Sequence, residues 1–486
     1  MTYSKTESFY NDDFKDFEEV LNTTFGIKDE ISAKFLKRML TNTVIKKSRI
    51  DIYNKKLILL SIFLFIPIIL YLFSSLIFRI FKKNKSNKYD VVFEGWNIDE
   101  EGNFRSFEKY YKGLIDKLPD CNLAIFKPHN FEQKDNHIAS RYNLDIIEND
   151  LFLNSNDAKK ILARFMSNYI KIVKMSLKTN TNYIYLFSKF FYHYVMYTVR
   201  VQNISKAGYF ISAGDNYFDA LMYSIYKKNG INNILLIQNS VRSEDYLASF
   251  YITCDKYFSL DSQIKNGYLG LEAYEKIVPI NSIGLYNAIS NIEIKSPKFD
   301  IVFIETPFNN MNISNEKDPL HLQTKCYFDT LELLSEFSKE HTDVKIIYRV
   351  KKKEHPESYS TFVEKRDKIL NVSNIKLDID IHNNSYEAIV DSKVTLFVVT
   401  TMGIEAITIG KRVLCCNFEK FDFLISKKDE IGVLVDKDYS LFRNKLLKLL
   451  CMEDENINKY FEEKRSVYGD ITESPYEKIL ETIKLG

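Results

Sequence analysis

The sequence predicts an α/β protein with two Rossmann-like, doubly wound domains that follow N-terminal helices and one transmembrane helix. Three observations lead to this prediction. Short apolar segments of strand length alternate with helical segments from residue 89 onward, and a break near residues 287–297 divides them into two sets. A run of 22 residues without charge precedes the first set. Alternation of strands and helices is typical of parallel sheets covered by helices.

The composition supports a globular protein and argues against general nucleic-acid binding. Of the 486 residues, 45% are hydrophobic and 27% are charged, as in folded domains. Because 65 Asp and Glu balance 67 Lys and Arg, the chain has no strong positive field for a nucleic acid. Its six cysteines lack the spacing of a metal site, which favours a reducing compartment.

The first 81 residues are predicted to be helical. Apolar residues at helical spacing in residues 1–55 predict amphipathic helices that pack on the body of the protein or lie on a membrane. Residues 56–81 are predicted to be a transmembrane helix, because the uncharged run Leu57–Phe78 would reach about 33 Å as a helix. We therefore expect a single-pass membrane protein whose catalytic part, in a bacterium, lies on the cytoplasmic face of the inner membrane. Basic residues flank both ends of the run, so its orientation stays open.

The predicted strands define two domains. The first, an acceptor domain over residues 88–290, contains the strands Tyr89–Gly95, Asn122–Pro128, Gly208–Asp215, Asn233–Asn239 and Lys256–Asp261. The second, a nucleotide-donor domain over residues 297–486, contains Phe299–Thr306, Asp343–Val350, Val394–Thr401 and Arg412–Phe418. Ligands of doubly wound sheets bind at the carboxyl ends of the strands, so we expect a cleft between the facing strand ends.

A basic loop follows the second strand of the second domain. The stretch YRVKKKEHPE contains the cationic residues Arg349, Lys351, Lys352 and Lys353, and also His355. Because the loop leaves the carboxyl end of its strand, these side chains could neutralise a phosphate or diphosphate. A solvated basic turn explains the same residues equally well.

The turn after Val394–Thr401 is a second candidate for anion binding. Thr400 and Thr401 precede a predicted helix that contains Gly403 and Glu405. Hydroxyl groups and free backbone N–H groups at a helix N-terminus bind anions, and a carboxylate nearby could accept hydrogen bonds from a ribose. Alternatively, a threonine caps the helix and Glu405 complements its dipole. Two such loops in one domain favour a nucleotide phosphate site.

The order of these motifs resembles a known group of enzymes. His355-Pro356, followed some 45 residues later by TTMGIEAITIGKRVL, resembles the C-terminal domain of GT-B-fold inverting glycosyltransferases of bacterial surface-polysaccharide biosynthesis. These include sialyl- and polysialyltransferases, capsular Kdo transferases and CDP-glycerol phosphotransferases. The resemblance implies that His355, Pro356 and the two threonines contact the phosphate of a CMP- or CDP-linked donor without a metal, and that Glu405 lies near the nucleoside. A weaker likeness covers GDNYFDALMYSIYKKNGINNILLIQNSVRS, where Ser240 replaces a glycine of the pattern.

Transfer chemistry requires a base that removes the proton of an acceptor hydroxyl. We expect this base in the first domain, across the cleft from the phosphate. Asp99, with the two glutamates that follow it, comes after the first predicted strand, and Asp215 comes after YFISAG. Each could instead be a solvated loop residue or a helix cap. Glu305, at the end of the first strand of the second domain, could orient donor or acceptor, or it could belong to a structural turn.

These features together predict a membrane-anchored, metal-independent inverting glycosyltransferase of surface-polysaccharide or glycolipid biosynthesis. Its expected partners are a nucleotide-activated sugar donor, a lipid-linked or membrane glycan acceptor and the membrane itself. No cofactor and no nucleic acid is expected. Three alternatives stay open: a polyol-phosphate transferase, a non-catalytic nucleotide- or glycan-binding membrane protein of the same fold, and a two-domain nucleotide-sugar epimerase.

Overall fold

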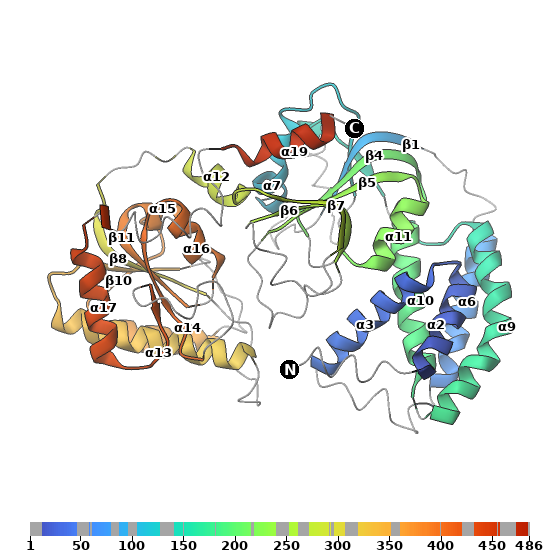
Figure 1. Ribbon diagram of the computed structural model, residues 1–486, viewed down its shortest axis with the longest axis horizontal. Helices are drawn as coiled ribbons and strands as arrows, with labels where there is room; N and C mark the ends of the chain where they lie inside the picture. The colour runs from blue at the N-terminus through green and yellow to red at the C-terminus, as the bar shows by residue number, and fades with distance from the viewer. Residues whose placement is uncertain are drawn as a thin grey trace.

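The structure is a computed structural model, and Figure 1 shows how its helices and strands are arranged. The residues that it describes are 12–45, 58, 61–78, 87–95, 105–126, 140–148, 150–179, 181–214, 218–239, 252–260, 272–290, 292, 296–306, 319–350, 360–398, 400–419, 432–453, 455–456 and 473–484.

Seven strands form the first sheet: β1 (Asn87–Phe93), β2 (Leu123–Phe126), β3 (Asp145–Ile147), β4 (Ile204–Ser212), β5 (Ile231–Ile237), β6 (Thr253–Ser259) and β7 (Glu272–Pro279). Their spatial order is β3-β2-β1-β4-β5-β6-β7, and all pairs are parallel. Val91 at the centre of the sheet lies opposite Leu123 on one side and Tyr209 on the other. The chain thus moves from β1 to one edge and from β4 to the other, which is a doubly wound topology.

Six strands form the second sheet: β8 (Phe299–Ile304), β9 (Ile346–Arg349), β10 (Ile375–Asp378), β11 (Ser392–Phe397), β12 (Arg412–Cys416) and β13 (Val433–Leu434). The order β10-β9-β8-β11-β12-β13 repeats the doubly wound topology, again with parallel pairs only. Central strands such as β9 are buried along their whole length, which is why they read as apolar runs in the sequence. The prediction of two Rossmann-like domains is confirmed.

Helices cover both faces of each sheet (Figure 1). Around the first sheet lie α2 (Asp12–Phe25), α3 (Asp29–Ile45), the 3-10 turn η1 (Ile62–Leu64), α6 (Phe65–Phe78), α7 (Arg105–Ile115), α9 (Ser155–Thr179), α10 (Tyr183–Val201), α11 (Ala220–Lys228), α12 (Ile283–Ile289) and α19 (Pro475–Lys484). Around the second lie α13 (Pro319–Glu340), α14 (Ser360–Leu370), α15 (Ser385–Val390), α16 (Thr401–Thr408) and α17 (Tyr439–Cys451).

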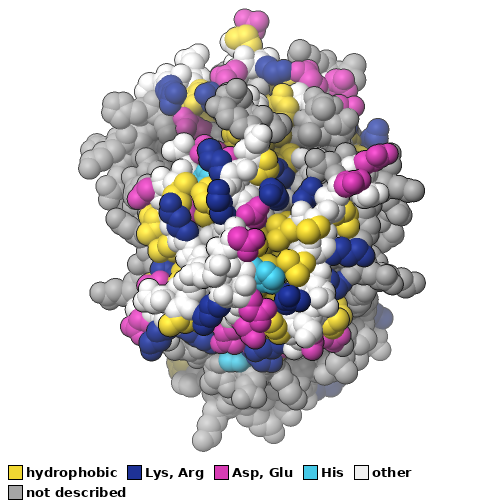
Figure 2. All heavy atoms as spheres, turned by 90° about the vertical axis from the view of Figure 1, so that its left-hand side faces the viewer, with side chains coloured by type: hydrophobic (Ala, Val, Ile, Leu, Met, Phe, Trp, Pro, Cys, Tyr) yellow, Lys and Arg dark blue, Asp and Glu magenta, His cyan; other side chains and the backbone are white. Residues whose placement is uncertain are grey.

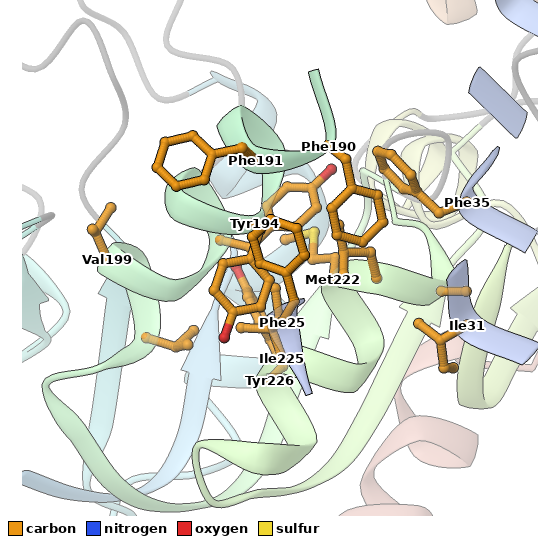
Figure 3. Packing of buried hydrophobic residues seen from close by; sticks show 14 of the residues in the cluster. Phe25, Ile31, Phe35, Phe190, Phe191, Tyr194, Val199, Met222, Ile225 and Tyr226 are labelled. Carbon is orange, nitrogen blue, oxygen red and sulfur yellow. The ribbon is translucent and has the colours of Figure 1, made fainter. Parts of the chain in front are cut away.

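The N-terminal helices form a bundle with α9, α10 and α11 on one side of the first sheet (Figure 1). Aromatic rings hold the bundle together. Phe25 of α2 lies 5.0 Å from Phe190 and 4.8 Å from Tyr194 of α10, measured between ring centroids (Figure 3). Phe35 of α3 lies 5.0 Å from the same Phe190. Burial of each such ring contributes about 1.5–3 kcal/mol, so α2 and α3 are part of the body of the protein.

The predicted transmembrane helix is wrong. In the described part of the uncharged run, the turn η1 precedes the helix α6, which has 14 residues and so extends about 21 Å, short of the roughly 30 Å of a hydrocarbon core. Pro67 lies in the first turn of α6, where its missing N–H costs no hydrogen bond. Among the residues that the structure describes, no helix combines the length and apolar character needed to cross a bilayer. This finding contradicts the single-pass localisation.

The C-terminal helix returns to the first sheet. Tyr476, Ile479 and Leu480 of α19 are buried in one cluster with Val91 and Phe93 of β1. The predicted division at residue 297 assigns residues 475–484 to the second domain, whereas in the structure they pack on the first. Helix α12, between the sheets, contacts α7 and α19 on one side and α15 on the other.

Candidate functional site

In each sheet the strand order reverses between two neighbouring strands, and this position is the switch point of the fold. It lies between β1 and β4 in the first sheet and between β8 and β11 in the second. The two candidate bases follow strands at the first switch point: Asp99 comes after β1 and Asp215 after β4. Both aspartates lie outside the described residues, as do Lys351, Lys353, His355 and Pro356 of the basic loop. The roles predicted for these six residues stay predictions.

Helix α16 begins at the second switch point, directly after β11. Thr400 is its N-cap, and its hydroxyl accepts a hydrogen bond from the backbone N–H of Met402 at 3.4 Å. The ring of Phe397 packs directly against Gly403, so a Cβ atom at position 403 would come within 2.3 Å of this ring. Thr400 therefore has the capping role that was the alternative to phosphate binding, and Gly403 has a packing role.

Thr401 and Glu405 line a hollow between the two domains. The first sheet and its linker contribute Leu260, which follows β6, and Asn281 and Ser282, which follow β7. The second domain contributes Thr401, Ile404, Glu405 and Thr408 of α16. Since Leu260 and Asn281 follow the carboxyl ends of their strands, this hollow lies where doubly wound domains bind ligands. Of the predicted residues that the structure describes, these two are the ones it brings to a common hollow.

Both oxygens of the Glu405 carboxylate have partners. Oε1 accepts a hydrogen bond from the hydroxyl of Ser282, and Oε2 accepts one from the hydroxyl of Tyr386 at 3.0 Å. Burial, together with the negative charge of Glu405, raises the pKa of Tyr386 well above its ordinary value, so this hydroxyl remains a donor. An ionised carboxylate has about four acceptor positions. Glu405 therefore keeps capacity for further donors while two protein hydroxyls fix its orientation.

Arg349 is largely buried and has partners within the second domain. Its side chain is 7% exposed and forms an ion pair with Asp378 at 3.1 Å. The same Nη1 donates to the carbonyl oxygen of His382 at 2.9 Å. Asp378 in turn accepts a hydrogen bond from the His382 ring at 2.7 Å. The guanidinium connects β9 to β10 and the turn that follows it, and the predicted contact of Arg349 with a phosphate stays a prediction.

Glu305 is also buried, directly after the carboxyl end of β8. Its carboxylate accepts hydrogen bonds from Tyr348 at 2.8 Å and from Arg366 at 3.1 Å, and its side chain has no exposed area. Burial acts to lower the pKa of Arg366, but its hydrogen bond to Asp367 and the carboxylate of Glu305 raise it overall. Glu305 thus joins β8, β9 and α14, and its predicted role in orienting donor or acceptor stays a prediction.

Three solved structures are distantly similar to this chain. The Methanocaldococcus jannaschii UDP-GlcNAc 2-epimerase in complex with UDP-GlcNAc and UDP matches 82% of this chain over 100% of its own, with a TM-score of 0.44 and 15% identity. The Burkholderia xenovorans trehalose-phosphate synthase in complex with glucose-6-phosphate matches 81% of this chain over 99% of its own, with a TM-score of 0.43 and 8% identity. The wall teichoic acid polymerase TagF with CDPG matches 83% of this chain over 88% of its own, with a TM-score of 0.39 and 12% identity.

These likenesses are distant. With TM-scores below 0.5 and identities of 15% or less, they carry no conclusion about activity. No family model matches the chain. No curated protein matches it either.

The two hydroxyl partners of Glu405 were missed in the sequence. Ser282 caps α12 by accepting a hydrogen bond from Leu285 N–H at 3.2 Å, and a serine before an apolar helical segment was a readable signal for that cap. Its bond to Glu405 had no signal, because it joins residues 123 positions apart. Tyr386 of α15 likewise donates to Glu405 from 19 positions away, which no pattern in the sequence indicates. Within the described residues, no group of three His, Cys, Asp or Glu side chains is placed to hold a metal ion.

Proposed function

We propose that this chain is a glycosyltransferase that uses a nucleotide-activated sugar, with CMP or CDP as the expected nucleotide. One observation carries the proposal: Thr401 and Glu405 of α16 line the same hollow as Asn281 and Ser282, between two doubly wound domains. The hollow thus offers the N-terminal turn of a helix, a carboxylate and an amide within one interdomain space. Helix N-termini favour anions, and carboxylates accept paired hydroxyls.

In this proposal the donor lies across α16. Its phosphate is placed at the N-terminus of α16, where Thr401 is the first helical residue, and its ribose is placed toward Glu405. His355, Lys351 and Lys353, which follow β9 in the chain, neutralise the leaving phosphate. Positioned cations and N–H groups stabilise charge that develops as the nucleotide departs.

The acceptor approaches from the first domain. Asp99 or Asp215, each following a strand at the first switch point, removes the proton from the acceptor hydroxyl, which attacks the anomeric carbon as the nucleotide leaves. One displacement of this kind inverts the configuration and requires no metal at the phosphate. We propose a lipid-linked or membrane glycan as the acceptor.

A donor panel tests the proposal. The purified chain is incubated with CMP-, CDP-, UDP- and GDP-linked donors and membrane glycans, with and without EDTA, and free nucleotide is measured. We expect release from a cytidine donor that persists in EDTA. Release of CMP from CDP-linked polyols alone would instead identify a polyol-phosphate transferase. Cytidine nucleotide binding without release from any donor would identify the non-catalytic alternative.

Variants of the hollow test the site. Thr401→Val and Glu405→Gln are expected to weaken cytidine nucleotide binding about tenfold, since each removes a charged or polar contact worth roughly 1.5 kcal/mol. Thr342→Val and Glu364→Gln make the same chemical changes at exposed positions of the second domain and serve as matched controls. Equal affinity in the hollow variants and the controls would remove this hollow from the proposal.

A further inference from the structure

Helix α6 presents an apolar row to the outside of the molecule. Phe63, in the turn before it, and the helical residues Ile66, Leu70, Phe73 and Ile77 are between 43% and 65% exposed. Their spacing of three or four positions places them on one side of the helix. The opposite side is buried against the bundle through Ile68, Leu72 and Ser75. No residue of α6 carries a charge.

Helix α9 continues this apolar surface. Met166, Ile170 and Leu177 are 56%, 62% and 54% exposed and also follow helical spacing. The two helices pack side by side: Tyr169 of α9 donates to the carbonyl oxygen of Ile62 at 2.8 Å, and its ring lies 5.0 Å from that of Phe65. Eight of the 14 large hydrophobic side chains exposed within the described residues therefore lie on α6, α9 and the turn η1 that leads into α6.

A basic strip borders the apolar surface. Helix α9 contains six cationic residues and one acidic residue, Asp157 in its first turn. Helical spacing places five of the cations on one side of α9. This side lies next to the exposed apolar residues of α9 and faces away from α6, and its members are Lys160, Arg164, Lys171, Lys174 and Lys178. All five are exposed, and within the described part of the chain none of them forms an ion pair.

The apolar and basic surface of α6 and α9 lies at one end of the molecule. Helices α6 and α9 lie at the end of the molecule farthest from the second domain (Figure 1). At the opposite end, acidic and basic side chains are interspersed across the surface of the second domain (Figure 2). A large apolar patch bordered by cations is complementary to a bilayer surface, which has an apolar interior and negatively charged headgroups.

We propose that this surface, the eight apolar residues of α6 and α9 with the five cations beside them, binds in the plane of a bilayer that contains anionic phospholipid. The apolar side chains enter the boundary between headgroups and acyl chains, and the lysines and arginine remain among the lipid phosphates. Both helices lie along the bilayer surface and neither crosses it. The inference is independent of the transfer reaction, since lipid binding is measured without donor or acceptor.

Vesicle flotation tests the proposal on the full chain. Wild-type protein is mixed with vesicles of phosphatidylcholine alone or with 30% phosphatidylglycerol, a mixture chosen to give roughly the charge of an anionic leaflet. We expect flotation with the anionic vesicles, at least tenfold weaker binding to neutral vesicles, and loss of binding at high salt. Leu70→Gln with Phe73→Gln, and separately Lys171→Glu with Lys174→Glu, are each expected to lower binding to anionic vesicles at least tenfold.

Two matched pairs control for general effects on the surface. Val372→Gln with Leu441→Gln removes exposed apolar side chains from the second domain, and Lys368→Glu with Lys448→Glu reverses exposed charges there. Both should bind vesicles within twofold of wild type, and all variants should unfold at the wild-type temperature because the altered side chains are exposed. Absence of wild-type flotation, or equal losses in the control pairs, would overturn the proposal. So would a dimer in sedimentation that Leu70→Gln with Phe73→Gln dissociates, because a second copy would then cover the surface.

Discussion

The carboxylate of Glu405 on α16 accepts a hydrogen bond from the hydroxyl of Ser282, the residue that caps α12. This contact joins a helix of the second domain to the segment that connects the two sheets. Tyr386 donates to the other oxygen, so Glu405 joins three elements: the linker, α15 and α16. The same side chain that we place near the nucleoside thus also holds the domains together.

Removal of the Glu405 carboxylate should destabilise the protein. Glu405→Ala leaves two partly buried hydroxyl donors without their acceptor, which costs about 1–3 kcal/mol. Glu405→Gln keeps an acceptor oxygen and should cost less. Urea unfolding of these variants and of Ser282→Ala, combined in a double-mutant cycle, measures the contact as a coupling of about 0.5–3 kcal/mol. A coupling near zero would show that the contact contributes nothing to stability.

Glu305 should behave as a structural residue in unfolding experiments. Glu305→Ala leaves Arg366 buried beside Tyr348 without this carboxylate, and breaking a buried ion pair costs about 3–5 kcal/mol. Nucleotide affinity, measured where the variant is still folded, should stay within twofold of wild type. Glu364→Ala on the exposed side of α14 is the control for loss of a glutamate. Lost nucleotide affinity with normal stability would restore Glu305 as a ligand of the donor.

Two glycine substitutions should have different costs. Gly403→Ala places a Cβ atom 2.3 Å from the ring of Phe397, which is fully buried, and overpacking of this kind costs about 1–3 kcal/mol. Gly284→Ala places a Cβ atom 2.2 Å from Cε of Lys109, near the end of a flexible side chain that can move. Thermal unfolding should therefore show a clear loss for the first variant and a smaller one for the second. Equal losses would contradict this explanation.

The helical bundle should lose stability in mild acid through His193. Burial between Phe35 and Tyr197 lowers the pKa of His193 below its ordinary 6.5, with Lys189 and Arg38 acting in the same direction and Asp219 against it. The unfolded chain therefore takes up this proton at a higher pH than the folded chain. Stability is fully present above pH 6.5 and falls as the pH decreases toward the folded pKa.

The urea midpoint, measured at pH 7.5 and at pH 5.5, tests this effect. His193→Gln should reduce the difference between the two midpoints, since glutamine does not titrate. His321→Gln, a substitution in the second domain, is the control and should leave the difference as in wild type. An unchanged difference in His193→Gln would assign the acid sensitivity to other groups.

The two sheets were predictable because their central strands are buried on both faces. Segments such as β9 and β11 appear in the sequence as short apolar runs between turn residues. The short edge strands β3 and β13, of three and two residues, give no such signal. Their place is decided by pairing with a neighbouring strand, which a single sequence does not contain.

Hydropathy alone failed at α6 because it does not distinguish a side chain that faces protein from one that faces solvent or lipid. Leu72 is fully buried and Leu70 is 61% exposed, yet the two contribute equally to an apolar run. Charge alone is ambiguous at Arg349 for a similar reason. Its partner Asp378 lies 29 positions away, so the sequence shows a cation at a strand end but not the ion pair that occupies it.

The return of α19 to the first sheet limits how the two halves of the molecule can move. The polypeptide passes from the first sheet to the second after α12 and comes back between α17 and α19. Helix α12 contacts α7 and α19 of the first half and α15 of the second, so the two halves are in contact at this helix and would turn relative to one another beside it. Closure on a bound molecule should therefore be a swing about a fixed axis.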